Sequence, residues 1–230
     1  ISNMKHKLIY ADYAATTPID KRVVRAMLPY FDKKYGNPAS MHKMGQDNLI
    51  VLNKCRKIAA DFIGANDNEI IFTGSASESN NLAIKGVMWA TKNKGNHLIV
   101  SSVEHDCVLE SAKWLSKNGF EVSYLPVDEY GMVDPKSVEK AIKKNTILVS
   151  VMQANNEIGT INPVSEIAKI CHKKGVLFHT DAAQTCGKIE VNVQKIDADL
   201  LTASSHKMYG PKGAAFLYIK KGIKIEPWIH

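Results

Sequence analysis

The chain has 230 residues, of which 45% are hydrophobic, so it is long enough for a well-buried domain and too apolar for a disordered segment. No apolar run approaches the roughly 20 residues of a membrane-spanning helix, and the first residues lack the apolar core of a signal peptide, so we expect a cytoplasmic protein. The net charge of +7 is spread along the chain in lysine pairs rather than gathered among aromatic residues, which argues against a nucleic-acid-binding protein.

The amino-terminal part of the chain predicts two helices and a loop. Apolar residues recur at helical spacing over residues 20–31 and again over residues 46–63. The segment between them, Tyr35-Gly36-Asn37-Pro38-Ala39-Ser40, is rich in residues that favour turns. We therefore expect two helices that do not form part of a sheet.

From Glu69 onward, short apolar runs alternate with segments of helical period. The predicted strands cover residues 70–73, 97–102, 122–126, 147–152, 176–180 and 200–203, and the predicted helices cover residues 78–92, 108–118, 135–143 and 164–174. Residues 214–219 predict one more strand, antiparallel and at the end of the sheet. This alternation indicates a three-layer α/β fold, a mostly parallel sheet with helices on both faces. Binding sites in such folds lie beyond the carboxyl ends of the strands.

The first strand ends offer a phosphate cradle and a histidine. Small residues, Gly74-Ser75-Ala76-Ser77, open the helix after the first strand, where free N–H groups and the helix dipole favour an anion. Plain helix capping explains the same residues. His105 follows the second strand, where it could stack on a planar ring and move protons, or could serve as a structural histidine in a polar turn.

The later strand ends carry the residues that are most informative. Residues 153–159 are a loop whose amide side chains could donate to a phenolate or a carboxylate. Asp181 ends a buried strand and needs a partner there, for which a protonated pyridinium nitrogen is suitable. Lys207 follows the next strand, and Ser204 and His206 beside it could bind phosphate. We therefore predict that Lys207 holds pyridoxal phosphate (PLP) as a Schiff base.

These residues occur in blocks that resemble a known family. The matching blocks are YADYAATTP (10–18), YGNPAS (35–40), TGSASESNNLAIK (73–85), Glu104-His105, NNEIG (155–159), HTDAAQ (179–184) and SSHKMYGPKG (204–213). On these motifs the chain resembles the cysteine desulfurases of the NifS/IscS type, class V aminotransferases of PLP fold type I. The blocks span nearly the whole chain, so the resemblance is specific.

The resemblance implies a role for each site residue. Lys207 binds PLP and acts as an acid and base, Asp181 pairs with the pyridinium nitrogen, and His105 stacks on the ring and assists proton transfer. Asn156 and Gln184 contact the phenolic oxygen or hold nearby groups. The residues implied to bind the phosphate are Ala76, Ser77, Ser204 and His206. The implied substrate is L-cysteine, which leaves as L-alanine after its sulfur passes to an enzyme cysteine and then to acceptor or Fe–S scaffold proteins.

The chain departs from the family pattern at Ser75 and Ser205, where glycine is usual, and a positive φ at Ser75 would carry a modest strain cost. In the family, a small carboxyl-terminal domain and the sulfur-accepting cysteine follow the cofactor lysine. We therefore expect a fragment, with residues 18–230 as the PLP-binding large domain and residues 1–17 as a segment that packs on the missing small domain.

The four cysteines also fit the expectation that the chain is a fragment without the sulfur-accepting cysteine. None of the four, Cys55, Cys107, Cys171 and Cys186, stands in the sulfur-accepting motif, and their spacing suits neither a metal site nor a disulfide framework. This chain alone is thus expected not to complete sulfur transfer.

Three readings remain open at this point. The first is the cysteine desulfurase. The second is another class V enzyme, such as a selenocysteine lyase or a cysteine-sulfinate lyase. The third is a scaffold or dimerisation fragment without a cofactor. A homodimer is expected in the first two, because sites of fold type I are usually built at a dimer interface.

Overall fold

The structure is a computed structural model that describes residues 8–229, and its centre is one mixed sheet. The strands are β1 (Ile70–Thr73), β2 (His97–Ser101), β3 (Glu121–Leu125), β4 (Thr146–Ser150), β5 (Leu177–Asp181), β6 (Leu200–Ser204) and β7 (Ala215–Ile219). The seven strands lie in the order β1-β7-β6-β5-β4-β2-β3. The pairs among β3, β2, β4, β5 and β6 are parallel, and β7 is antiparallel to both of its neighbours. The predicted fold class is confirmed.

The place of β7 differs from the prediction. The strand is antiparallel as expected, but it lies between β1 and β6, and β1 forms the edge of the sheet. Its run Ala215–Ile219 is almost wholly buried, as an internal strand requires, whereas the middle residues of β1, Ile71 and Phe72, are exposed. Because β1 and β6 both pair antiparallel with β7, they run in the same direction, and Gly74 follows β1 at the carboxyl edge of the parallel strands.

The predicted helices are found to within a few residues, except that one of them is divided, and the short helix Val193–Ile196 was not predicted. They are α1 (Lys21–Met27), α2 (Pro29–Asp32), α3 (Lys43–Ile63), α4 (Ala76–Ala90), α5 (Asp106–Lys117), α6 (Pro135–Ala141), α7 (Val164–Lys173) and α8 (Val193–Ile196), with 3-10 turns η1 (Asp67–Glu69) and η2 (Ser205–Lys207). The helix predicted over residues 20–31 is divided into α1 and α2, because Pro29 lacks the N–H that would continue the helix. Among the described helices, none has both the length and the apolar character that crossing a membrane requires.

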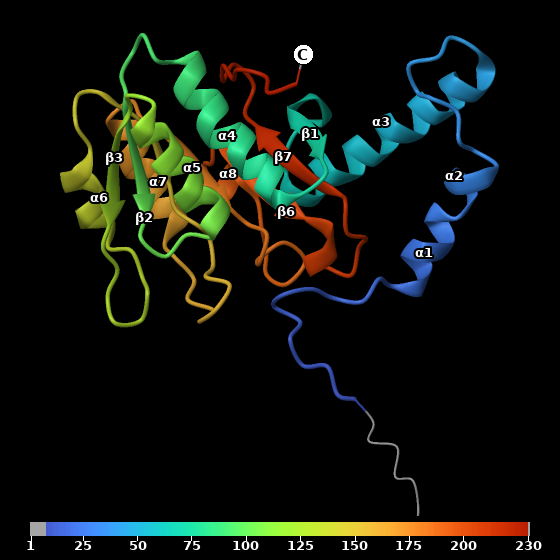
Figure 1. Cartoon of the computed structure of the whole chain (residues 1–230), viewed down its shortest axis with the longest axis horizontal. Helices are drawn as coiled ribbons and strands as arrows, with labels where there is room; N and C mark the ends of the chain where they lie inside the picture. The colour runs from blue at the N-terminus through green and yellow to red at the C-terminus, as the bar shows by residue number, and fades with distance from the viewer. Residues whose placement is uncertain (1–7, 230) are drawn as a thin grey trace, which may run out of the picture.

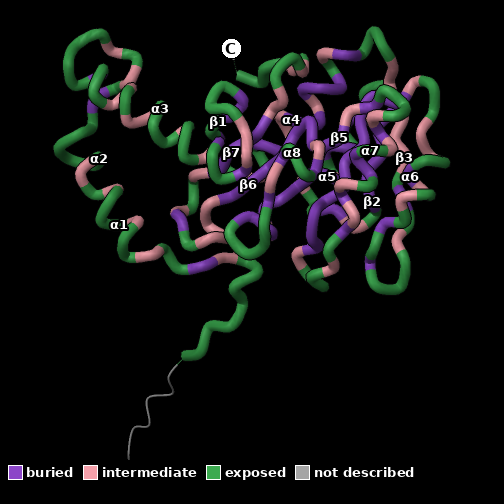
Figure 2. Tube along the Cα trace, turned by 180° about the vertical axis from the view of Figure 1, so that it is seen from behind, coloured by how far each residue is buried: buried purple, intermediate pink, exposed green. Residues whose placement is uncertain are grey.

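Apolar side chains of each strand alternate between two layers of core. Leu98 and Val100 of β2 pack with α4 and α5, while Ile99 between them packs on the opposite face with α6, α7, α8 and the end of α3. Figure 2 shows these buried segments gathered around the sheet. Both faces of the sheet are therefore covered, which is why the central strands carry almost no polar residue facing solvent.

The amino-terminal helices extend away from this body. In Figure 1, α1, α2 and the first part of α3 form an arm beside the sheet, and only the end of α3 reaches the core. Phe31 and Ile50 on this arm are exposed, and Leu8 and Ile9 near the start of the described chain are more than four-fifths exposed. The prediction that residues 1–17 pack on a further domain concerns partly residues 1–7, which lie outside the described residues, and it stays a prediction.

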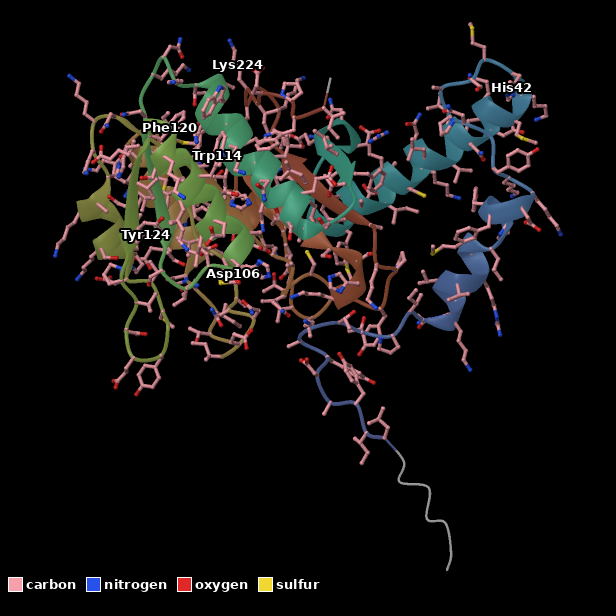
Figure 3. The ribbon with its side chains drawn as sticks, in the orientation of Figure 1. His42, Asp106, Trp114, Phe120, Tyr124 and Lys224 are labelled. Atoms are coloured by element: carbon pink, nitrogen blue, oxygen red, sulfur yellow. The ribbon has the colours of Figure 1, made fainter. Side chains whose placement is uncertain are left out.

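The direction of the strands decides where a site is expected. In Figure 3, Phe120 precedes β3 and Tyr124 lies near its end, so the parallel strands run from the upper to the lower edge of the view. Asp106, at the start of α5, lies at that lower edge, and Lys224 lies at the opposite one. Loops that follow the parallel strands therefore meet on the side of Asp106.

Candidate active site

A cavity of about 430 Å³ opens at this carboxyl edge. Its volume lies within the range of small-molecule sites. It is lined by Asp12, Ala14, Ala15, Ser75, Ala76, Ser77, His105, Cys107, Met152, Asn156, Glu157, Asp181, Ala183, Gln184, His206 and Lys207. Residues that follow β1, β2, β4, β5 and β6 thus meet around one hollow. Of the predicted site residues, only Ser204 is not part of the lining.

Lys207 lies at the end of η2, directly after β6, and is half-buried. Burial lowers the pKa of Lys207, and the nearby carboxylates of Asp181 and Glu157 offset part of that decrease. A lysine with a lowered pKa has a larger fraction of neutral amine at neutral pH, which is the nucleophilic form. Tyr209, two residues on, has a φ of 63°, so the backbone just past the lysine is in the left-handed region.

Asp181 closes β5 and is 6% exposed. Its Oδ1 accepts a hydrogen bond from the N–H of Ala183 (2.8 Å), and its Oδ2 accepts one from Nδ2 of Asn80 (2.6 Å). These two donors hold the carboxylate in a fixed orientation at the cavity wall. Asn80 was not among the predicted site residues, although the block that contains it, Thr73–Lys85, was recognised.

The start of α4 supplies N–H groups to the same cavity. Ser75 is the N-cap, its hydroxyl accepting from the N–H of Glu78 (3.1 Å). No hydrogen bond among the described residues uses the N–H of Ala76 or Ser77, both of which line the cavity. Ser75 has a φ of −163°, which is extended backbone open to any residue, so the condition for strain at this position is not met.

His105 is the N-cap of α5, and its ring nitrogen Nδ1 accepts from the N–H of Cys107 (3.2 Å). The thiol of Cys107 also lies 3.1 Å from this nitrogen. Burial raises the pKa of the Cys107 thiol, so it is protonated at neutral pH. Because a backbone N–H only donates, this contact favours the neutral imidazole that carries its proton on Nε2.

The loop after β4 and the turn after β5 carry the two amides predicted to face a cofactor. Nδ2 of Asn156 donates to Oε1 of Glu157 (2.6 Å). Gln184 donates through Nε2 to the carbonyl of Ala14 (2.9 Å) and accepts from Nζ of Lys188 (2.8 Å). Both side chains line the cavity, but each is already engaged with protein groups.

The segment Ala14–Thr17 is a part of the site that sequence reasoning did not identify. The N–H and hydroxyl of Thr17 both donate to the carbonyl of His206 (2.9 Å each), and Nδ1 of His206 lies 3.1 Å from the hydroxyl of Thr16. These contacts join positions about 190 apart in the sequence. The block Tyr10–Pro18 was the available signal, since it matched the family but was predicted to pack on a further domain and was given no part in the site.

Several buried side chains near the cavity have an oxygen without a partner among the described residues, and Glu104 and Ser204 are two of them. Oε1 of Glu104 accepts from the hydroxyl of Ser101 (2.6 Å) and from the N–H of Met152 (2.7 Å), while its Oε2 has no partner among the described residues. Burial raises the pKa of Glu104 to about 8, so it is mostly protonated at pH 7. The hydroxyl of Ser204 is likewise buried without a partner in the described part of the chain.

Comparisons with known proteins agree with one another. The family model for aminotransferase class-V matches residues 9–230. A cysteine desulfurase IscS of Dictyoglomus turgidum is 53% identical over 222 residues, which cover 96% of this chain and 56% of that protein. A cysteine desulfurase IscS of Methanosarcina thermophila is 50% identical over 226 residues, which cover 98% and 56%. The chain therefore spans about half the length of these curated relatives.

Solved structures give the same result. A NIFS-like protein superposes with a TM-score of 0.93 at 42% identity, covering 95% of this chain and 60% of its own. A structure of SspA in complex with cysteine also has a TM-score of 0.93, at 41% identity, and the match covers 96% of this chain and 64% of that one. The arrangement of strands around the cavity is thus shared with proteins of known structure.

Proposed function

The chain belongs to the aminotransferase class-V family, and from that premise we propose that it forms the PLP-binding part of a cysteine desulfurase. The observation that carries this proposal is the pairing of Lys207 with Asp181 across one cavity. The half-buried amine of Lys207, whose pKa is lowered, and the carboxylate of Asp181, which two hydrogen bonds keep in place, line the same cavity. The start of α4 supplies N–H groups there that no hydrogen bond among the described residues uses. Together they offer a covalent anchor, a partner for a ring nitrogen and a phosphate cradle.

The donors and acceptors of the cavity fit PLP, the cofactor on which this family depends. Bound there, PLP would withdraw electrons from a substrate amino acid through its ring. The carboxylate of Asp181 would hold the proton on the ring nitrogen, because the two protein donors on its oxygens keep it oriented at the cavity wall. The N–H groups of Ala76 and Ser77 would bind the phosphate.

The remaining predicted residues keep their proposed roles. Lys207 would hold the cofactor and move a proton at the substrate Cα. His105 would stack on the cofactor ring and assist proton transfer through its Nε2–H. Asn156 and Gln184 would orient the phenolic oxygen. His206 lines the cavity, and Ser204, whose buried hydroxyl has no partner among residues 8–229, is likewise proposed to contribute to phosphate binding.

The four cysteines do not suit the sulfur-accepting step. Cys171 and Cys186 are fully buried, and burial raises the pKa of each thiol to about 12, which makes both unreactive. The pKa of Cys107 is raised as well, and Cys55 is exposed on the arm, in the lining of a different hollow. We therefore propose that sulfur from L-cysteine passes to a cysteine outside this set and then to acceptor or Fe–S scaffold proteins.

The rest of the proposal concerns organisation. We propose residues 18–230 as the cofactor domain, a homodimer as the working form, and a cytoplasmic location, although one relative is described as mitosomal. The complex of SspA with cysteine supports L-cysteine as the substrate. Because the chain spans 56% of its curated relatives, the complete activity is proposed for the whole protein.

Titration with PLP tests the cofactor assignment. The protein should turn yellow, and borohydride should remove the colour and fix one PLP on Lys207, as peptide mass mapping would show. Lys207→Ala should stay colourless, while Lys212→Ala, a change at a nearby lysine outside the cavity lining, should behave as the wild type. A wild-type protein that stays colourless with excess PLP would favour the scaffold reading instead.

A further inference from the structure

Asn80 lies fully buried on α4, one turn beyond the helix start that faces the cavity. Ser77 and Asn80 are separated by three positions, so they share one face of the helix. Its amide nitrogen carries two hydrogens, and the structure gives each a partner, Oδ2 of Asp181 at 2.6 Å and Sγ of Cys107 at 3.2 Å. One side chain therefore touches the last residue of β5 and a residue that follows β2.

Cys107 continues the chain of contacts on α5, which packs beside α4 on the same face of the sheet (Figure 1). Its sulfur accepts from Asn80, and it lies 3.1 Å from Nδ1 of His105. The raised pKa keeps the thiol protonated, so its hydrogen is free to point at Nδ1. The direction of each bond is then determined, because Asn80 donates to the sulfur and the sulfur donates to the imidazole.

We propose that Asn80 and Cys107 are positioning residues that connect Asp181 to His105 through hydrogen bonds of fixed direction. At one end, the Asn80 amide aims the carboxylate of Asp181 into the cavity. At the other end, the thiol of Cys107 reinforces the backbone N–H that keeps Nδ1 of His105 an acceptor and leaves the proton on Nε2. Two groups on different elements are thereby set relative to each other before any ligand enters.

The same contacts give α4 a second task. Its first turn carries the free N–H groups of Ala76 and Ser77, and Asn80 one turn later holds Asp181. The distance between an anion at the helix start and a ring nitrogen at Asp181 is therefore set by one rigid helix rather than by separate loops. This part of the inference rests on the proposed function, whereas the state of His105 can be observed without any cofactor.

The experiment uses the full-length protein and two readouts. The ¹⁵N chemical shifts of the His105 ring, recorded without PLP, report which nitrogen carries the proton. The dissociation constant for PLP, measured by absorbance titration, reports how well Asp181 is placed. We expect the wild type to show the Nε2–H form, and Asn80→Ala to weaken PLP binding by about 10-fold or more, since it removes a hydrogen bond to a charged group.

Three further variants make the result specific. Cys107→Ala keeps the backbone N–H that donates to Nδ1 and loses only the thiol donor, so the fraction of His105 with its proton on Nδ1 should rise above that of the wild type. Cys107→Ser should keep the wild-type shifts, because a hydroxyl both accepts and donates as the thiol does. Asn81→Ala, on the same helix but bonded to Ser77 and Lys85 instead, should leave PLP affinity unchanged. If Asn80→Ala fails to fold, the His105 shifts of the alanine and serine variants of Cys107 still test whether the thiol sets the position of the His105 proton.

Two results would overturn the inference. One is a wild-type His105 that carries its proton on Nδ1. The other is Asn80→Ala with wild-type PLP affinity and unchanged His105 shifts. A wild type that binds no PLP would instead refute the proposed function, and the His105 shifts would still test the connection between Asn80, Cys107 and His105.

Discussion

Replacing Glu104 with glutamine is expected to remove a loss of stability that the wild-type protein undergoes as pH rises from about 4.5 to 8. The carboxyl is 5% exposed, and burial raises its pKa from 4.5 to about 8. A group whose pKa is higher in the folded state stabilises fully below its unfolded pKa, and this contribution is lost as pH rises toward the folded value. Wild-type stability should therefore fall between about pH 4.5 and 8.

The size of the effect follows from the same shift. At pH 7 Glu104 is ionised in the unfolded chain and must take up a proton on folding. Because pH 7 lies 7 − 4.5 = 2.5 units above the unfolded pKa, this proton uptake costs about 3 kcal/mol of folding free energy. Glu104→Gln removes this cost and keeps an oxygen that accepts from Ser101 and Met152. Its amide adds one buried N–H without a partner, which costs about 1 kcal/mol.

Glu104→Gln should thus be less stable than the wild type near pH 4.5 by about 1 kcal/mol and more stable at pH 7 by about 2 kcal/mol. Urea unfolding at several pH values between 4.5 and 8 measures this crossing. Glu139→Gln, at an exposed position on α6, should show no crossing. If Glu104→Gln were less stable at every pH, the buried carboxyl would be ionised in the folded state and the reasoning would be wrong.

Other positions give separate tests. Burial lowers the pKa of His179 from 6.5 to about 3, so this histidine is neutral in the folded protein. The free energy of unfolding should therefore fall as pH decreases below 6.5, and His179→Asn should reduce that fall in urea unfolding. Burial lowers the pKa of His172, but the hydrogen bonds and charges of Asp199 and Asp197 together outweigh it and raise that pKa. The stabilisation by His172 should therefore be present below pH 6.5 and fade above it, and His172→Gln should lose this dependence in thermal unfolding. Leu148→Ala, in the fully buried centre of β4, should cost about 2 to 5 kcal/mol by denaturant unfolding, and a loss below 1 kcal/mol would mean that the site refills.

Much of this protein follows from local patterns that the sequence displays. Short apolar runs and helix-period segments placed the strands and most helices within a few residues, because burial on two faces requires that spacing. The positions of Asp181 and Lys207 at strand ends predicted one site, since parallel strands bring their carboxyl ends to the same edge. The order of chemical groups along the chain was thus enough to predict a PLP site.

Only the tertiary structure decided which distant groups touch. Asn80 meets Asp181 across 101 positions, and Thr17 meets His206 across 189. The burial of Glu104 and the position of β7 between β1 and β6 are likewise features that only the tertiary structure decides. Each depends on how helices and strands pack. Local spacing shows which elements end at the same edge of the sheet, but it does not show which side chains touch or become buried, so these contacts and the protonation of Glu104 follow only from the folded chain.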